Sequence, residues 1–164
     1  MTQTTKPSIT RESARAEMEA TRAAFHELLD SLSEAEFRKQ SGNGAWSNGQ
    51  LMWHCAWGIS YIPQGVGRCR SGKDLKLPRG LFDLLNPWIT RWGSRGITKQ
   101  SIGKKYDEAN AAALKVLETI KDDEWSRGVK MAGTPITIES EFRMPAVHFD
   151  EHKADILKSL GRSE

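Results

Sequence analysis

One segment, from Leu51 to Ile59, constrains the fold more than any other part of this sequence. It is apolar almost all the way round a helix, and a helix of that kind is buried on most of its sides. Its start is marked by Ser47 and Gln50, which have the S-x-x-Q spacing of a capping box. Trp46 and Leu51 stand where a hydrophobic staple places its apolar pair. We therefore expect a helix that begins directly after Ser47 and that other elements surround.

Three further segments carry apolar residues at the spacing of amphipathic helices, with charged residues between them. They are residues 10–32, about 103–120 and about 137–160. Thr10 is a candidate N-cap of the first segment, and Gly161 is a candidate C′ glycine of the last. Packed around the buried segment, these helices predict an all-α fold, and specifically a four-helix bundle.

The length of 164 residues predicts one domain, since a domain of about 150 residues buries roughly 68–70% of the surface of its unfolded chain. We expect residues 1–9 to form a flexible leader and residues 10–161 to form the single bundle domain. The composition, 38% hydrophobic and 27% charged, is typical of an ordered soluble protein rather than of a disordered one.

Two connections between the predicted helices carry structure of their own. Residues 71–100 form a long crossover between the second and third helices, in which apolar residues recur at helical spacing until Asn86 and Pro87 interrupt them. A connection of this length is either functional or a crossover, so we expect one or two short helices across the bundle that line a pocket mouth. Residues 128–138 alternate apolar and polar residues around a turn, which predicts a small hairpin or an extended turn before the last helix.

Charge and hydropathy argue against several kinds of partner. The 24 basic and 21 acidic residues leave a net charge of +3, and no run of basic residues reaches the roughly five to eight typical of a nucleic-acid patch. The N-terminal residues lack the apolar core of a signal peptide, and no stretch approaches the roughly 18 apolar residues needed to span a membrane. We expect a cytoplasmic protein with a small-molecule substrate and with neither nucleic acid nor a membrane as partner. A homodimer is left open, since symmetric dimers are common.

The histidines point to a metal site. His148 and His152 lie four residues apart in the last predicted helix, where their Cβ atoms would be about 5–6 Å apart and both rings could hold one ion. Zinc at a catalytic site usually takes about three protein ligands. His54, inside the apolar segment, is the candidate third ligand because a buried imidazole needs a partner, whereas His26 is expected at the solvent edge of its helix. Spacing alone leaves open the alternative of a satisfied core His54 and two surface histidines.

A family resemblance favours the metal site over that alternative. The sequence resembles the DinB-like superfamily of four-helix-bundle metalloproteins in the order of three motifs. These are Trp46-Ser47, then His54 in an apolar helix, then His148-x-x-x-His152 in the final helix. The resemblance implies that the three histidines bind one divalent metal ion and that a long crossover joins the second and third helices. Relatives with assigned activities include enzymes that use bacillithiol, mycothiol or glutathione, as S-transferases or as maleylpyruvate isomerases.

From this resemblance we expect a divalent-metal-dependent enzyme that uses a low-molecular-weight thiol, as an S-transferase or an isomerase. In such an enzyme a thiol bound to the metal is held as thiolate and attacks an electrophile in the mouth of the bundle. Zinc is the default metal, with nickel, iron or manganese as alternatives, since cellular selection depends on availability. A metal-dependent hydrolase and a non-catalytic bundle that binds metal or a small ligand are the competing interpretations.

Residues around the histidine pair extend the predicted site. His148 to His152 also matches the H-x-x-E-H pattern of inverted zincin proteases, which would make Glu151 a general base. Only twelve residues follow His152, too few for the distant acidic ligand of those enzymes, so Glu151 is a candidate catalytic residue or a solvated surface charge. Asp155 could hold the other ring nitrogen of His152, and Pro145 predicts a bent helix or a fresh helical start just before His148.

Three further groups of residues have an expected place. Four tryptophans at helical spacing are expected in the core, or else in a pocket wall: Trp53, Trp57, Trp88 and Trp92. Three basic residues near them could receive an acidic group of a thiol cofactor: Arg91, Arg95 and Lys99. The two cysteines are expected to be buried free thiols: Cys55 and Cys69.

Overall fold

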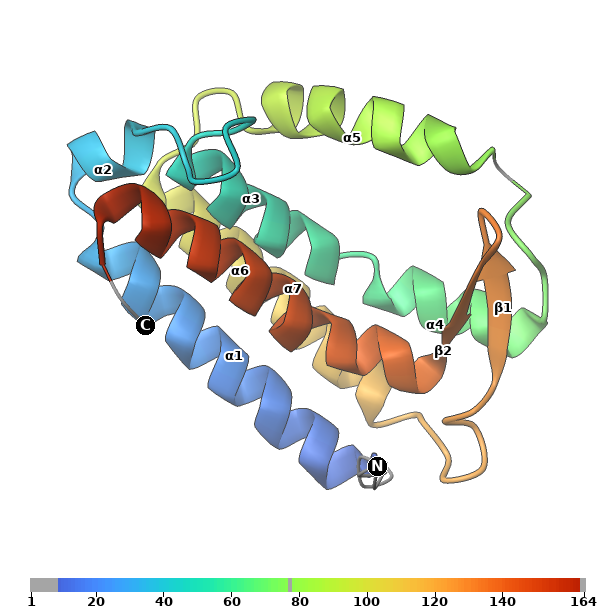
Figure 1. Cartoon of the computed structure of the whole chain (residues 1–164). Coiled ribbons are helices and arrows are strands. Elements are labelled where there is room, and N and C mark those ends of the chain that lie inside the picture. The colour runs from blue at the N-terminus through green and yellow to red at the C-terminus, as the bar shows by residue number, and fades with distance from the viewer. Residues whose placement is uncertain (1–8, 77, 163–164) are drawn as a thin grey trace, which may run out of the picture.

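The computed structural model describes residues 9–76 and 78–162, with residues 79–84 described by their backbone alone. Its elements, in chain order, are α1 (Arg11–Ser31), α2 (Glu34–Arg38), α3 (Asn48–Ile59), α4 (Ile62–Ser71), α5 (Arg79–Gly93), α6 (Lys99–Leu117), β1 (Gly128–Met131), β2 (Thr134–Thr137) and α7 (Ile138–Leu160). The predicted helical class is confirmed, together with the small hairpin before the last helix (Figure 1). The predicted leader lies outside the described residues, except for Ile9, which is buried.

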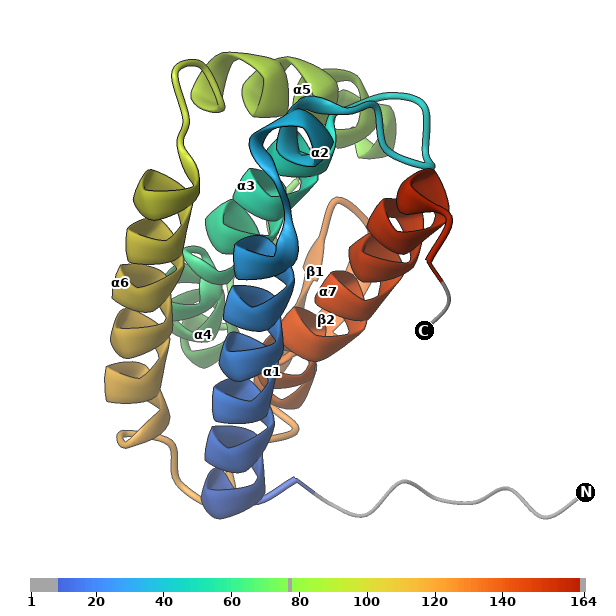
Figure 2. The same cartoon turned by 90° about the vertical axis from the view of Figure 1, so that its left-hand side faces the viewer.

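Four long helices form the bundle: α1, α3, α6 and α7 (Figures 1 and 2). Each of them packs against two others, so that the order around the bundle is α1, α6, α3, α7. After a short break α4 follows α3 and also packs against α6 and α7, which lengthens the side of the bundle that α3 begins. The predicted four-helix bundle is therefore confirmed.

Local capping signals explain where the bundle helices begin and end. Thr10, Ser47 and Thr137 each accept a hydrogen bond from the backbone N–H three residues further on, so α1, α3 and α7 begin where the sequence predicts. Gly161 has a φ of 66°, the left-handed conformation of a C′ glycine, and ends α7. In contrast, α6 begins about one turn before its predicted start, because Thr98 caps it.

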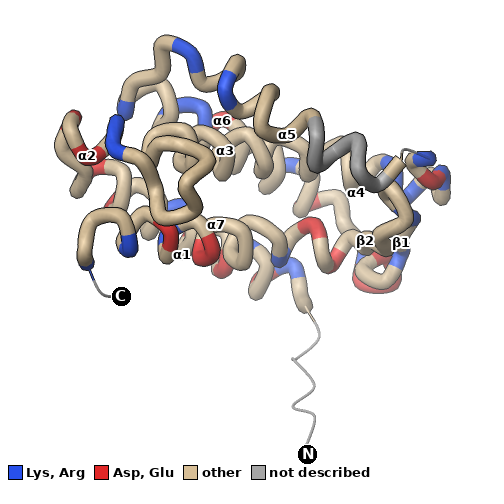
Figure 3. The backbone as a smooth tube through the Cα atoms, turned by 45° about the horizontal axis from the view of Figure 1, so that its top comes forward, with Lys and Arg blue, Asp and Glu red and all other residues tan. Residues whose placement is uncertain are grey.

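Aromatic side chains from three helices meet in the centre of the bundle. Phe25 of α1 stacks on Tyr106 of α6, with 4.0 Å between ring centroids, and lies 5.8 Å from the ring of Phe149 of α7. Trp53 is buried as predicted, while Trp57 is only partly buried. The fourth side of this core is α3, which carries no charged residue, whereas both signs of charge are spread over the other bundle helices (Figure 3). The predicted burial of α3 is confirmed.

The crossover between α4 and α6 differs from the prediction. Its helix, α5, is continuous with Pro87 inside it, so the predicted interruption at Asn86 and Pro87 is wrong. A proline removes one backbone hydrogen bond, but inner-face contacts, including the fully buried Thr90, hold α5 across α3. The outer face of α5 meets solvent, with Trp88 at 61% and Trp92 at 58% exposed. The expectation that these two tryptophans lie in the core is therefore wrong.

The hairpin of β1 and β2 anchors the start of the crossover. The strands pair antiparallel through Ala132 and Gly133, whose φ angles are 50° and 83°, and positive φ at both turn residues suits the twist of a two-residue hairpin. Leu75 joins this hairpin: its N–H donates to the Lys130 carbonyl at 2.9 Å, and its carbonyl accepts from the Ala132 N–H at 3.0 Å. The crossover is thereby fixed beside the first turn of α7, which follows β2 directly.

The last helix is unbroken from Ile138 to Leu160, with Pro145 inside it. The alternative of a fresh helical start at Pro145 is therefore wrong. The continuous helix fixes the spacing of every side chain that α7 contributes to the site. Within the described part of the chain, no helix combines the length and the apolar character that crossing a lipid bilayer requires.

Candidate metal centre

Three histidines from two helices converge between α3 and α7. His54 comes from the middle of α3, and His148 and His152 come from successive turns of α7. Each ring offers a nitrogen, and the three ligand atoms lie within 4.8 Å of one another. The Nε2 atoms of His148 and His152 are 3.1 Å apart. The structure thus brings together the three residues that the sequence predicts as ligands.

The surroundings keep these imidazoles neutral. Burial lowers the pKa of His54 to about 3, and the neighbouring His148 and His152 rings add to this effect. Burial, followed by the charge of His152, lowers the pKa of His148 to about 4. The pKa of His152 is also lowered by burial, against the opposing effect of Asp155 and Glu151. Three neutral rings at neutral pH offer free lone pairs, as metal ligands must.

The Nδ1 atoms of His54 and His152 differ in whether they have a hydrogen-bond partner. Thr90 of the crossover helix places its hydroxyl 3.3 Å from Nδ1 of His54, which leaves Nε2 as the free nitrogen of that ring. Nδ1 of His152 is buried and has no hydrogen bond within the described residues. The carboxylate of Asp155 is 3.9 Å from it, too far for a hydrogen bond. The structure therefore places Asp155 beside His152, as expected, but without the predicted hydrogen bond.

Aromatic rings wall the centre on the α3 side. The ring centroid of His54 lies 5.0 Å from that of Trp46 and 5.8 Å from that of Trp57. Trp46 also lies 6.4 Å from the ring of His152. Trp46 is therefore both the staple residue that orients α3 and part of the wall that keeps water from two of the histidines.

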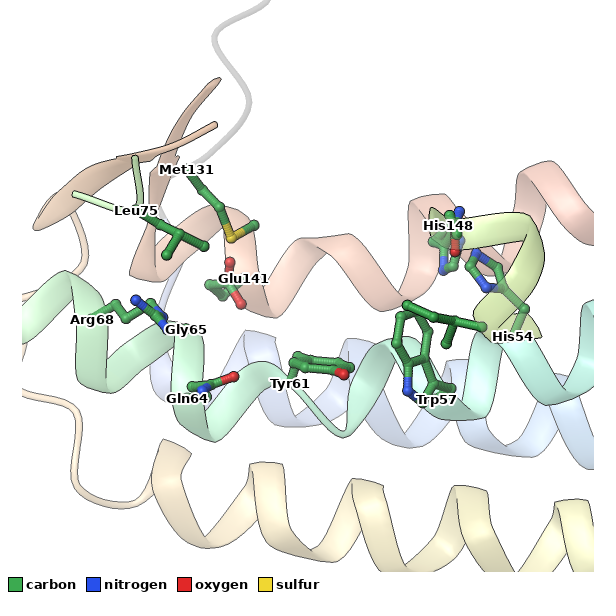
Figure 4. A pocket seen from close by; sticks show the side chains of 13 residues that line it. His54, Trp57, Tyr61, Gln64, Gly65, Arg68, Leu75, Met131, Glu141 and His148 are labelled. Carbon is green, nitrogen blue, oxygen red and sulfur yellow. The ribbon is translucent and has the colours of Figure 1, made fainter. Parts of the chain in front are cut away.

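A cavity of about 340 Å³ runs from the histidines to the hairpin (Figure 4). It lies between α4 and α7 under the crossover, and is lined by His54, Trp57, Gly58, Tyr61, Gln64, Gly65, Arg68, Leu75, Asn86, Ile89, Met131, Glu141 and His148. Leu75, Asn86 and Ile89 belong to residues 71–100, which confirms the prediction that the crossover lines a pocket. Burial raises the pKa of Glu141 to about 7.

Other residues singled out in the sequence lie away from this cavity. Glu151 is exposed on α7 and is not one of the lining residues; its catalytic role stays a prediction. The Arg95 guanidinium lies 3.7 Å over the ring of Trp92, and Lys99 donates to the carbonyl of Leu32 at 2.7 Å. Arg91 of α5 is also outside the lining, so none of the three basic residues lines the cavity, and their role in binding an acidic group of a thiol cofactor stays a prediction.

The remaining histidine, His26, and the two cysteines are not part of the candidate metal centre. Nε2 of His26 lies 2.8 Å from Oδ1 of Asp107 on the neighbouring α6, with 30% of its side chain exposed. This agrees with its predicted place at the solvent edge. Cys55 and Cys69 are both buried and free, as predicted.

The polar residues of the site that are missing from the prediction include Thr90 and Glu141. Thr90 stands in the crossover, and nothing in the local sequence signals that it meets a histidine of another helix. Glu141 could have been found, because it precedes His148 by seven residues, and that spacing places both side chains on one face of a helix.

Comparisons with known proteins agree with this fold. The profile of the DinB superfamily matches residues 17–156. The fold is similar to that of YfiT from Bacillus subtilis, described as a probable metal-dependent hydrolase with an unusual four-helix bundle topology. The TM-score is 0.74 at 16% identity, over 97% of this chain and 95% of YfiT. It is also similar to a mycothiol-dependent maleylpyruvate isomerase, with a TM-score of 0.70 at 16% identity, over 90% of this chain and 61% of the isomerase. No curated protein sequence matches the chain.

Proposed function

The chain belongs to the DinB superfamily, and from this premise we propose that it is a divalent-metal-dependent enzyme acting on a small molecule. One observation carries the proposal: His54, His148 and His152 converge at one end of a cavity of about 340 Å³. Three imidazoles with an open position beside them form a known type of catalytic metal site. Zinc is the default ion, and imidazole ligands also suit nickel and iron.

The residues present fit such an ion. Their ligand atoms lie within 4.8 Å of one another, the lowered pKa values keep the rings neutral, and Thr90 occupies the second nitrogen of His54. His54 and His148 line the cavity, whereas His152 does not. Two of the three rings that would hold the ion therefore face the cavity, where a substrate can enter.

We propose thiol-dependent S-transfer or isomerisation as the reaction class. When bound, a divalent ion would lower the pKa of a coordinated thiol or water molecule. The chain supplies the rest: Trp46 and Trp57 exclude bulk water from the histidines, and Tyr61 and Ile89 form apolar walls for an electrophile. The fold that the chain shares with a mycothiol-dependent maleylpyruvate isomerase supports this class.

A metal-dependent hydrolase is the second candidate. It is favoured by the similarity to YfiT, described as a probable metal-dependent hydrolase, which extends over nearly the full length of both chains. A hydrolase needs a group beside the centre to take a proton from water, and Glu151, the predicted base, faces solvent instead. This placement makes the thiol reaction the stronger proposal.

Spectroscopy of the Co²⁺-substituted protein separates the two candidates. Bacillithiol, mycothiol and glutathione are titrated in turn, and at least one is expected to change the visible spectrum by adding a thiolate ligand to the ion. His148→Ala is the control, which should bind no Co²⁺ and show no change. If no thiol alters the spectrum while the protein hydrolyses esters or amides in a metal-dependent way, the thiol proposal fails in favour of the hydrolase.

A further inference from the structure

The end of the cavity away from the histidines contains a carboxyl group that has no partner among the described residues. Glu141 projects from α7 into this end (Figure 4). It is partly buried, and it forms neither an ion pair nor a hydrogen bond within the described residues. Burial alone raises the pKa of this group to about 7. A carboxyl group taken from water without compensation costs free energy, which a cationic group of a ligand would recover.

Gly65 gives the Glu141 carboxyl its place against the facing helix. A Cβ atom at position 65 would lie 2.2 Å from Oε2 of Glu141 and 2.5 Å from its Cδ. Any side chain there would therefore displace the carboxyl group. The glycine lets the group lie directly against the backbone of α4, at the wall of the cavity.

A positive charge stands one turn away on the same helix. Arg68 follows Gly65 by three residues on α4, a spacing that makes helix side chains neighbours at about 5–6 Å. It also lines the cavity, and it has no ion pair within the described residues. Arg68 and Glu141 come from facing helices (Figure 4) and do not neutralise each other. The two charges are therefore both available to a ligand that carries one charge of each sign.

The distance to the histidines sets the length of that ligand. Glu141 precedes His148 by seven residues of one continuous helix, which corresponds to a rise of about 10.5 Å along one face. Between the two ends the cavity is walled by Trp57, Tyr61 and Ile89. The site thus fits an extended molecule with a charged head, an apolar or uncharged middle, and a metal-binding end.

We propose that Glu141 and Arg68 form a subsite for an α-amino-acid head group, with Glu141 receiving the ammonium and Arg68 the carboxylate. The proposal deepens the proposed function, and it rests on that function for the other end of the ligand, which would lie at the histidines. Glu141 and Arg68 are specificity residues in this assignment, because they hold the end of the substrate that does not react.

Calorimetric titration with three probes tests this assignment on the full-length protein, with and without added Zn²⁺. L-2-Aminosuberate carries the complete head group and a distant carboxylate, suberate lacks the amine, and 7-aminoheptanoate lacks the head-group carboxylate. The wild type should bind L-2-aminosuberate about tenfold more tightly than either other probe, as expected for a charge-assisted hydrogen bond.

Matched variants assign each half of the head group. Glu141→Gln should abolish the preference for L-2-aminosuberate over suberate, and Arg68→Gln should abolish its preference over 7-aminoheptanoate. Asp150→Asn removes a charge from the exposed face of α7 and should leave both preferences unchanged, and thermal melting checks that each variant is folded. Equal affinity for the three probes, no measurable binding of L-2-aminosuberate, or a preference that survives in Glu141→Gln would overturn the assignment.

The same titrations separate this assignment from the proposed function. A protein that takes up no Zn²⁺ but keeps the preference for L-2-aminosuberate contradicts the metal centre and supports the subsite. A protein that binds Zn²⁺ and shows no preference contradicts the subsite alone.

Discussion

At Gly49 the packing of α3 leaves no room for a side chain. A Cβ atom there would lie 2.6 to 2.9 Å from three carbon atoms of the Phe37 ring, and Phe37 is itself buried with 5% of its surface exposed. This contact fixes the short helix α2 against the start of α3. The ring of a buried phenylalanine cannot move aside as the end of an exposed side chain can.

We predict that Gly49→Ala destabilises the protein by about 1–2 kcal/mol, since overpacking of about 1–3 kcal/mol outweighs the gain in helix propensity. Gly67→Ala is the matched control, because position 67 is also helical and has no atom within 4 Å of the added Cβ. That control should be neutral or more stable than the wild type. Urea denaturation measures both variants. Equal stability of the two would show that the clash with Phe37 is absent.

At the scale of single elements, α5 contacts the candidate metal centre as well as covering the cavity. Its fully buried Thr90 meets Nδ1 of His54 at 3.3 Å, and a partner of this kind fixes the orientation of a metal-binding imidazole. The crossover helix thereby acts on a ligand that belongs to α3. Its influence reaches the centre through one hydroxyl group.

We predict that Thr90→Val weakens metal binding about 10- to 100-fold, because it removes the hydroxyl but keeps the shape of the side chain. Thr90→Ser retains the hydroxyl and should bind metal nearly as well as the wild type. Competition with a chromophoric chelator measures the dissociation constants. If valine and serine give the same affinity, the hydroxyl has no part in orienting His54.

Elements with local signals could be predicted from the sequence, and those held by tertiary contacts could not. Thr10, Ser47 and Thr137 cap their helices through residues three positions away, so the sequence alone reveals these starts. Pro87 suggests a break that α5 does not have, because contacts with α3 outweigh one missing hydrogen bond. The orientation of α5, which exposes Trp88, also depends on the whole bundle and has no local signal.

The candidate site also combines residues that could be predicted from the sequence with residues that could not. The four-residue spacing of His148 and His152 fixes both on one face of a helix, and the apolar segment around His54 marks it as buried. The family resemblance then selected one metal centre over separate histidines. Thr90 could not be predicted, because its contact with His54 exists only after α5 has crossed α3. Glu141 does have a signal in the sequence, because it precedes His148 by seven residues and so lies on the same face of a helix.

At the scale of the whole molecule, an ion pair between the exposed Arg70 and the buried Glu124 ties α4 to the segment after α6. Arg70 donates to both carboxylate oxygens of Glu124, at 3.1 and 2.9 Å, and also to the carbonyl of Thr119 at 2.8 Å. The hydrogen bonds from Arg70 to the carboxylate, followed by the one from the N–H of Lys121, lower the pKa of Glu124 from 4.5 to about 2. Because the pKa is lower in the folded state, the pair stabilises the fold above about pH 4.5, and this contribution is lost as the pH falls toward 2.

We predict that Glu124→Gln is less stable than the wild type at pH 6 and that this difference disappears between about pH 4.5 and pH 2. Thermal melting across this pH range measures the difference in stability between the variant and the wild type. Groups that titrate alike in both proteins do not contribute to this difference. Asp150→Asn, an exposed control, should show a small difference that does not depend on pH. A deficit of Glu124→Gln that stays constant down to pH 2 would contradict the role of the ionised pair.

The proposed metal centre would join α3 to α7 through His54, His148 and His152. The most direct test is elemental analysis of protein purified without a histidine tag or added metal, for the wild type, His54→Ala and His148→Ala. His26→Ala is the control, since His26 pairs with Asp107 away from the site. We predict about one divalent ion per chain in the wild type and in the control, and none in the two site variants. A wild type without metal that takes up none on titration, or a His54→Ala variant that keeps its ion, would contradict the three-histidine centre.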